Sequence, residues 1–587
     1  MKLNKYFFLC LFFFFSCGPN NYDKPLSNRI ANYKMDCTFL PGEKLIQANQ
    51  VLTWKNTSPD TLSELQFHLY MNAFKNPQST FWQEAGFYPN ELKGHEGYTD
   101  IKTIFMGEQN LTANLTFLHP DDENAKDATV CSLRLPTPLP PGKTITLKMD
   151  FETKLPPLTE RAGFYKQFFI VSQWFPKIGV YENGAWNCHQ YHYNSEFFAD
   201  FGNYDVQIAL PDSYVVAATG NLIKKEPGEN HQKTFSFQAK DVHDFAWSAG
   251  TNLTQSVIPY RDLNIRLYLQ PQHRDMAGRF VEAAERAYQY CSMTYGLYPY
   301  SQISIVDTPV FNTVMEYPML FFTGNFSRPD AVFADEKPVP VNNLFPERLT
   351  IHEFAHSWWY GMVANNEFED AWLDEGFAEF TTARVFEAAY GDLLFAGDGL
   401  EPVKIREFRK EDFRQQPGVI VHTNAWNHQS YKEYYIATYI KPKLLLYTLN
   451  NYFGDDIWNS VIRTYFQNWK FKHPTTADFI ATVNTVTGQD WTPFLKQYLE
   501  TGAHLDYAIK TVQDKKATIS NSGALNFPVN ILFKFADGSQ ETKQWTEFDG
   551  QEITFDFADK PALVEIRIDP GNIIEFELNK ENNVWRN

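Results

Sequence analysis

The stretch "IHEFAHSWWYGMVANNEFEDAWLDEGFAEF", from Ile351 to Phe380, holds two histidines with a glutamate between them and several later carboxylates. Pro346 suits the first turn of a helix, and no helix breaker follows it before Gly361. His352 and His356 are four residues apart, so a helix places both on one face, about one turn from each other. Unless this is an ordinary pair of amphipathic helices, the spacing indicates a metal site.

Two imidazoles in this arrangement can bind one tetrahedral zinc ion. A catalytic zinc takes three protein ligands and leaves a fourth position open for water. Glu353 lies beside the two histidines, where it would hold a water molecule near the metal and act as general base. Glu375 follows His356 by 19 residues, in the segment "WLDEGFAEF", which predicts a second helix.

The spacing HExxH-x18-E, with "WL-x-E-G" around the last glutamate, resembles the aminopeptidase N family of gluzincin metallopeptidases. In the thermolysin-like clan the third zinc ligand is a glutamate on the following helix. The resemblance therefore implies that Glu375 joins His352 and His356, and that each chain binds one Zn²⁺. Asp374 stands where the family usually has Asn, at a position on which metal binding should not depend.

The chain is too long, at 587 residues, for one hydrophobic core, and we expect about three domains. Alternating segments dominate before about residue 251, helical periodicity dominates from about 275 to 502, and alternation then returns. Family members have an N-terminal β saddle, a thermolysin-like catalytic domain and often a small β-sandwich. We therefore predict a multidomain α+β fold, with a β saddle at 18–255, a mainly helical catalytic domain with a small sheet at 256–503, and a C-terminal β-sandwich at 504–587.

The segment "NTVMEYPMLFF", residues 312–322, matches a G-x-M-E-N motif that the family carries on an edge strand before the zinc helix. Met315 and Glu316 align with that motif, whereas Thr313 and Tyr317 depart from it. An aminopeptidase must bind a free α-ammonium, and a carboxylate near the metal supplies a charge-assisted hydrogen bond to it. The resemblance implies that Glu316 has this role, and that extended backbone at Met315 pairs with the substrate.

Hydrolysis also needs a donor for the developing oxyanion, and the family uses a tyrosine in a Y-x-K-G segment. Here the matching segment is Tyr439–Pro442, with proline in place of glycine. The family often adds a second polar group from the β saddle to bind the ammonium, for which Gln173 is the candidate. Glu379, one helical turn after Glu375, is a candidate for orienting a metal ligand. Three nearby tyrosines compete with Tyr439 for the oxyanion: Tyr431, Tyr434 and Tyr435.

The N-terminal segment "MKLNKYFFLCLFFFFSCGPNN" has lysines at its start, then an apolar run of roughly ten residues, then Ser16-Cys17. A helix needs ~20 residues to span a bilayer, so this run indicates an export signal. The segment resembles a bacterial lipoprotein signal, which implies that residues 1–17 end at a lipidated Cys17. A plain secretory peptide cleaved elsewhere is the alternative.

Net charge is −18, from 52 basic and 70 acidic side chains, which argues against nucleic acid and against electrostatic docking on anionic lipid. We expect membrane contact through the lipid on Cys17 only, and no protein partner can be inferred. The sequence predicts a zinc aminopeptidase, exported and anchored to the bacterial cell envelope on its periplasmic or outer-membrane face, which acts on peptides with a free N-terminus. The alternatives are an endopeptidase on the same fold and an inactive, lipid-anchored peptide-binding protein.

Overall fold

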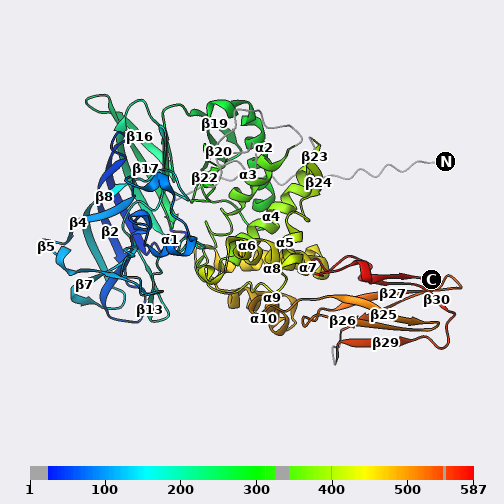
Figure 1. The fold of residues 1–587 in the computed structure, drawn as a ribbon. Coiled ribbons are helices and arrows are strands. Elements are labelled where there is room, and N and C mark those ends of the chain that lie inside the picture. Colours follow the sequence, from blue (N-terminus) through cyan, green and yellow to red (C-terminus); the bar gives the residue numbers. More distant parts are fainter. Residues whose placement is uncertain (1–23, 311–312, 325–342, 398–399, 547–549) are drawn as a thin grey trace, which may run out of the picture.

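The computed structural model describes residues 24–310, 313–324, 343–397, 400–546 and 550–587. Three regions follow one another along the chain: a β-rich region, a mainly helical region, and a second β region at the C-terminal end (Figure 1). The predicted multidomain α+β fold is confirmed. The predicted signal at 1–17, with Cys17, lies outside the described residues, as does Asn312. Within the described ranges, no helix is both long enough and apolar enough to cross a membrane.

The first region is built around an eight-stranded sheet. Its central strands alternate apolar and polar residues. In β8 (Thr144–Lys154), apolar side chains such as Leu147 and Met149 are buried while their neighbours face solvent. The buried face packs on two four-stranded sheets: Phe39 contacts Phe169 and Trp247 of one, and the Tyr33 hydroxyl oxygen accepts a hydrogen bond from the Ile178 N–H of the other. The order of the large sheet is β16 (Asn221–Pro227), β17 (Gln232–Val242), β14 (Gly202–Pro211), β1 (Ala31–Leu40), β2 (Leu45–Lys55), β8, β4 (Tyr98–Met106) and β5 (Gln109–Asn110).

The second region contains the small sheet that was expected. Its order is β19 (Thr254–Tyr260), β20 (Leu263–Leu269), β21 (Gln302–Asp307) and β22 (Leu320–Thr323). The first pair is antiparallel, and the other two pairs are parallel. Strand β19 begins at Thr254 and pairs with β20. This sheet therefore starts slightly before the predicted boundary at residue 255.

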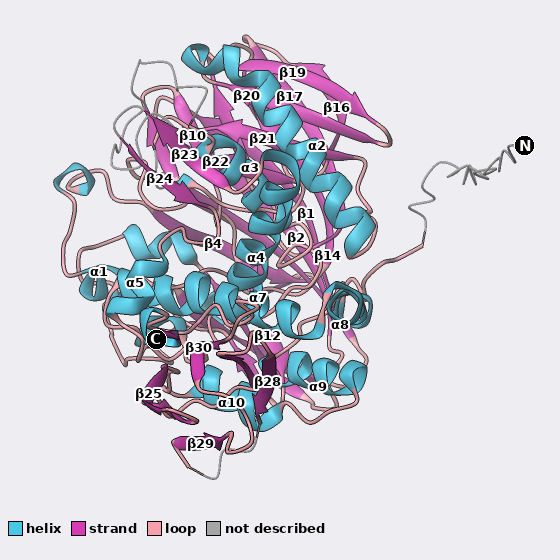
Figure 2. Ribbon diagram, turned by 90° about the vertical axis from the view of Figure 1, so that its right-hand side faces the viewer, coloured by secondary structure: helices cyan, strands magenta, loops and turns pink. Residues whose placement is uncertain are grey.

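Helices pack on this sheet and carry the histidine motif. Helices α2 (Ala277–Thr294) and α3 (Phe345–Ala355) contact β20 and β22 respectively, and α4 (Trp372–Tyr390) packs on α3 (Figure 2). Helices α7 (Lys441–Phe453), α8 (Asp455–Trp469), α9 (Thr476–Thr487) and α10 (Thr492–Glu500) follow. Helix α9 ends at a left-handed glycine, Gly488, with φ +68°.

The C-terminal region consists of two packed sheets. One has the order β25 (Tyr507–Gln513), β26 (Lys516–Asn521) and β29 (Glu552–Asp556). The other has the order β28 (Gln540–Trp545), β27 (Val529–Phe535), β30 (Leu563–Ile568) and β31 (Val584–Arg586). Their inner faces meet at pairs such as Phe533 and Phe555, whose ring centroids are 5.1 Å apart.

Candidate active site

Helix α3 presents both histidines of the motif, although it is shorter than the sequence suggested. It ends at Ala355, before Gly361, with His356 as its C-terminal cap. The chain turns there because the Gly361 N–H donates to the His356 carbonyl at 2.7 Å, and Tyr360 adopts φ +107°. The His356 N–H still donates to the His352 carbonyl (3.2 Å), so the one-turn spacing of the two imidazoles is kept.

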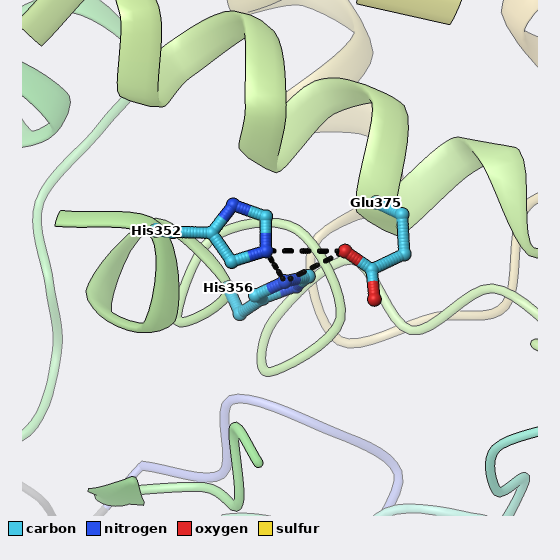
Figure 3. Close-up of side chains that lie close together, drawn as sticks. All are labelled: His352, His356 and Glu375. Carbon is cyan, nitrogen blue, oxygen red and sulfur yellow. Dashed lines mark hydrogen bonds and ion pairs between the residues drawn. The ribbon is translucent and has the colours of Figure 1, made fainter. Parts of the chain in front are cut away.

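The three predicted metal ligands converge. The Nε2 atoms of His352 and His356 are 3.3 Å apart, and Glu375 Oε2 lies 3.2 Å from the first and 3.3 Å from the second (Figure 3). Zinc bound tetrahedrally to N and O at about 2.0–2.1 Å requires ligand atoms about 3.3–3.4 Å from one another. The donor set and its spacing therefore fit zinc, and all three side chains are buried.

Outer contacts orient the two imidazoles. The Trp359 carbonyl lies 3.0 Å from His356 Nδ1, so this nitrogen carries the proton and Nε2 keeps its lone pair for a metal. The Nδ1 of His352 has Thr382 Oγ1 at 3.4 Å and Glu379 Oε1 at 3.6 Å. Glu379 thus lies where the sequence suggested, on the side of the His352 ring that faces away from the metal.

The third ligand is held from a second helix. Burial acts to raise the pKa of Glu375, but the two imidazoles, His356 above all, outweigh it and hold its pKa below the ordinary value. Glu375 Oε2 faces the imidazoles, and Oε1 accepts a hydrogen bond from the Tyr439 hydroxyl. Burial and Glu375 raise the pKa of Tyr439 well above its usual value, so the phenol is a neutral donor beside the metal ligands.

A local irregularity places Tyr439 at the site. It lies in a π-helical segment, Ile436–Ile440, between α6 (Tyr431–Tyr435) and α7. Pro442 has no N–H, so it cannot donate a hydrogen bond to the Thr438 carbonyl. The helical hydrogen bonds therefore widen from the α to the π pattern in the turn before Pro442. Tyr431, Tyr434 and Tyr435 line the same cavity, but the hydroxyl that bonds to Glu375 is that of Tyr439.

Two further carboxylates enter the cavity, which has a volume of about 620 Å³. Glu316 Oε1 and Glu353 Oε2 are buried and have no hydrogen-bond partner among the residues that the structure describes. Burial raises the pKa of Glu316 to about 7; the charge of His356 opposes this rise, and Glu375 adds to it. Burial, with Glu316 nearby, also raises the pKa of Glu353 well above its usual value. Such unpaired buried carboxylates are costly for stability, and the cost is typical of a site that binds a ligand.

The backbone at Met315 is already paired. Its N–H donates to the Phe322 carbonyl (3.3 Å), and its carbonyl accepts from the Phe322 N–H (2.9 Å). The Met315 side chain is fully buried and does not line the cavity, whereas Val314 and Glu316 on either side do. The structure therefore brings Glu316 to the site and places Met315 as a core residue behind it.

Gln173 does not reach the cavity, contrary to the expectation from sequence. Its Nε2 donates to Asp244 Oδ2 (2.7 Å), and its Oε1 accepts from Lys177 Nζ (2.7 Å). Lys177 also pairs with Asp244 at 2.6 Å, and all three side chains are buried. The amide is thus engaged in an internal network that balances a buried lysine, and Gln173 is not among the residues that line the cavity.

Among the polar groups that the N-terminal region does contribute to the cavity is Glu196. It lines the cavity and pairs with Arg161, whose Nε lies 3.1 Å from Glu196 Oε2. Burial raises the pKa of Glu196 to about 7, against the opposing charge of Arg161. Sequence reasoning missed both residues, because no spacing connects them to the histidine motif.

The comparisons with known proteins agree with this geometry. Residues 279–498 match the model of the Peptidase family M1 domain. Glutamyl aminopeptidase of Rattus norvegicus is 20% identical over 418 residues, 65% of this chain and 42% of that protein. A leukotriene A-4 hydrolase homolog of Botryotinia fuckeliana is 25% identical over 312 residues, 48% of this chain and 43% of that protein. The chain thus spans less than half the length of these relatives.

Solved structures share the fold at low sequence identity. An M1 zinc metallopeptidase from Deinococcus radiodurans aligns with a TM-score of 0.56 at 17% identity, over 81% of this chain and 94% of its own. Legionella pneumophila aminopeptidase A, solved in complex with aspartic acid, aligns with a TM-score of 0.63 at 17% identity, over 92% of this chain and 58% of its own. The chain thus has a Peptidase family M1 domain at residues 279–498, and the comparisons support an aminopeptidase N-like gluzincin.

Proposed function

We propose that the protein is a zinc-dependent aminopeptidase, which removes residues from the N-terminus of peptides. The observation that carries this proposal is the unpaired, buried carboxylate of Glu316 beside the ligand set His352, His356 and Glu375. An unpaired carboxylate next to a metal site suits the α-ammonium of a substrate whose first carbonyl lies on the metal.

Each side chain of the site has a distinct role in this proposal. Zinc, when bound, would polarise the scissile carbonyl and lower the pKa of a water molecule. Glu316 binds the substrate ammonium and thereby sets which carbonyl is attacked. Glu353 takes a proton from the attacking water and passes it to the leaving amine. The neutral phenol of Tyr439 donates a hydrogen bond to the carbonyl oxygen as negative charge develops there.

Two alternatives predict different behaviour. An endopeptidase would need a route for peptide past Glu316, whereas the orientation of this carboxylate into the cavity favours a substrate that ends there. An inactive peptide-binding protein would have no need of Glu353, which is present beside a complete ligand set.

A panel of peptides tests the proposal. The zinc-loaded protein should release the first residue from peptides with a free N-terminus and should barely cleave the same peptides after acetylation. Removal of zinc with a chelator should abolish the activity, and added zinc should restore it. Equal cleavage of free and acetylated peptides would establish the endopeptidase instead. A complete lack of cleavage by zinc-loaded protein would leave the binding protein.

We also propose that the protein is exported and held at the bacterial cell envelope by a lipid on Cys17. The charged start, the short apolar run and the Ser16-Cys17 pair support this proposal. Mass spectrometry of the N-terminal peptide of the mature protein tests it. A lipidated Cys17 as first residue is expected, and an unmodified start after Cys17 would show simple secretion.

A further inference from the structure

Three basic side chains follow one another along helix α3 beside the cavity. Arg348, His352 and His356 are spaced four residues apart, so they form one stripe on the helix. At 1.5 Å per residue, the eight residues from Arg348 to His356 cover about 12 Å. At the His356 end, carboxylate oxygens of Glu316 and Asp374 lie within 4.8 Å of a His356 nitrogen. The metal ligands thus lie between an acidic end and the end that carries Arg348.

Positive charge exceeds negative charge at the Arg348 end. Arg348 is buried and pairs with Glu379, and Lys443 lies 3.9 Å from the same carboxylate. Two cations therefore share one anion. The Arg348 guanidinium also stacks over the Phe408 ring at 4.6 Å, and within the described part of the chain its buried Nε has no hydrogen-bond partner.

Arg409 repeats this arrangement closer to solvent. It lines the cavity with 34% of its side chain exposed, and its Nε donates to Asp412 Oδ2 at 2.8 Å. Lys432 pairs with the same carboxylate at 3.3 Å, so again two cations share one anion. The Arg409 guanidinium lies 3.9 Å above the Tyr435 ring, which in turn stacks on Tyr439 at 4.3 Å. A stack of planar groups thus connects Arg409 to the tyrosine that bonds to Glu375.

We propose that Arg348 and Arg409 form a carboxylate-binding end of the cavity, and that the preferred substrates are short peptides with a carboxylate one or two residues beyond the cleaved bond. The inference rests on the proposed aminopeptidase function. It follows from the layout, since a peptide with its ammonium at Glu316 and its first carbonyl at the metal ligands continues toward Arg348. Each residue adds at most ~3.3–3.6 Å, so a tripeptide matches the length of the stripe.

Guanidinium groups suit this task because they bind carboxylates in a planar, two-pronged manner. The carboxylate has two possible sources: the C-terminus of a dipeptide or tripeptide, or an acidic side chain just after the cleaved bond. Both present the same group to the same place. Arg409 is the better target for mutation, since its partial exposure makes a folding defect less severe than that expected for the buried Arg348.

Kinetics on matched peptides test the proposal. The wild-type protein should cleave tri-alanine with a kcat/KM roughly ten- to a hundredfold higher than tri-alanine amide, the size expected for one charge-assisted contact. Arg409→Gln should raise KM for the acid more than for the amide, so that the acid-to-amide ratio of kcat/KM falls toward one. Arg409→Lys should keep part of the preference. Ala-Glu-amide against Ala-Gln-amide distinguishes the side-chain source from the C-terminal source.

A matched control and a separate readout complete the experiment. Arg414→Gln, on the short helix α5 (Lys410–Gln415) that begins directly after Arg409, removes an exposed arginine that pairs with Glu411 and should leave every ratio unchanged. Equal wild-type rates on acid and amide peptides of both kinds would overturn this inference while leaving the aminopeptidase intact. No cleavage of any peptide by protein with one bound zinc would overturn both.

Discussion

Gly376 and Pro442 touch so closely that a Cβ added to the glycine would lie 2.4 Å from the proline Cβ. Gly376 follows the metal-ligand candidate Glu375, and Pro442 comes one turn after Tyr439. The contact between the two residues therefore sets how α4 approaches the helix that carries the phenol. Any side chain at position 376 must push the two helices apart or shift one along the other.

We predict that Gly376→Ala separates Glu375 from Tyr439. Overpacking of this kind typically costs 1–3 kcal/mol of stability, and a displacement near the chemistry lowers turnover by roughly ten- to a hundredfold. Thermal unfolding and kcat on a free-amine peptide measure the two effects. Gly278→Ala is the control, because a Cβ there meets nothing within 4 Å, and its stability should be equal to wild type or slightly higher. Wild-type kinetics in Gly376→Ala would show that this contact does not position the phenol.

We predict that Glu353→Gln keeps its zinc and loses its turnover. Glu353 lines the cavity beside the ligands without being one of them, so the metal site should survive while the general base is lost. General acid–base catalysis contributes roughly 10²- to 10⁴-fold, and kcat should fall by that amount. Metal analysis of the purified variant accompanies the kinetics. Loss of zinc, or a near-normal rate, would contradict the role assigned to this glutamate.

We predict that Glu316→Ala weakens the binding of free N-termini. Its carboxylate would pair with the substrate ammonium in both ground and transition states, so the effect should appear mainly in KM. A contact of this kind is worth about 1.5–3 kcal/mol, which corresponds to roughly ten- to a hundredfold in kcat/KM on free-amine peptides. Slow residual cleavage of acetylated peptides should be unaffected. An equal loss on free and acetylated peptides would point to a structural role instead.

The sequence predicts best the positions that a short-range pattern fixes. His352, Glu353 and His356 are fixed relative to one another by a single helical turn, so their spacing alone places them. Glu375 required the family resemblance as well, since its place depends on how α4 packs on α3. The end of α3 was missed, because nothing in the sequence before Gly361 shows that the chain turns at His356.

The N-terminal region shows where such reasoning fails. Gln173 was a reasonable candidate by residue type, but its amide is held by Lys177 and Asp244, the second of which lies 71 residues away along the chain. Glu196 reaches the cavity instead, through a pairing with Arg161 35 residues before it. Contacts between such distant residues arise from the packing of sheets against one another, and a single sequence carries no local pattern for them.

A histidine connects the N-terminal region to the catalytic region and supports a prediction about pH. His189 Nδ1 lies 2.7 Å from Asp121 Oδ1, and its Nε2 lies 3.1 Å from Glu369 Oε1. Asp121 belongs to the N-terminal region, whereas Glu369 lies in the M1 domain, just before α4. Burial acts to lower the pKa of His189, but hydrogen bonds to Asp121 and Glu369 outweigh it and raise the pKa to about 9.

We predict that this contact stabilises the protein below neutral pH and is lost in alkali. Because the folded pKa of about 9 is above the unfolded value of 6.5, the contribution is complete below about pH 6.5 and disappears as pH rises toward 9. A pKa difference of that size corresponds to at most about 3 kcal/mol in the free energy of unfolding. His189→Gln should therefore lower the free energy of unfolding at pH 6 and converge with wild type above pH 9, as measured by urea denaturation across that range. His231→Gln, at a side chain that is 95% exposed, should follow the wild-type curve at every pH. A constant difference between His189→Gln and wild type from pH 6 to 9.5 would show that the ring contributes packing rather than charge.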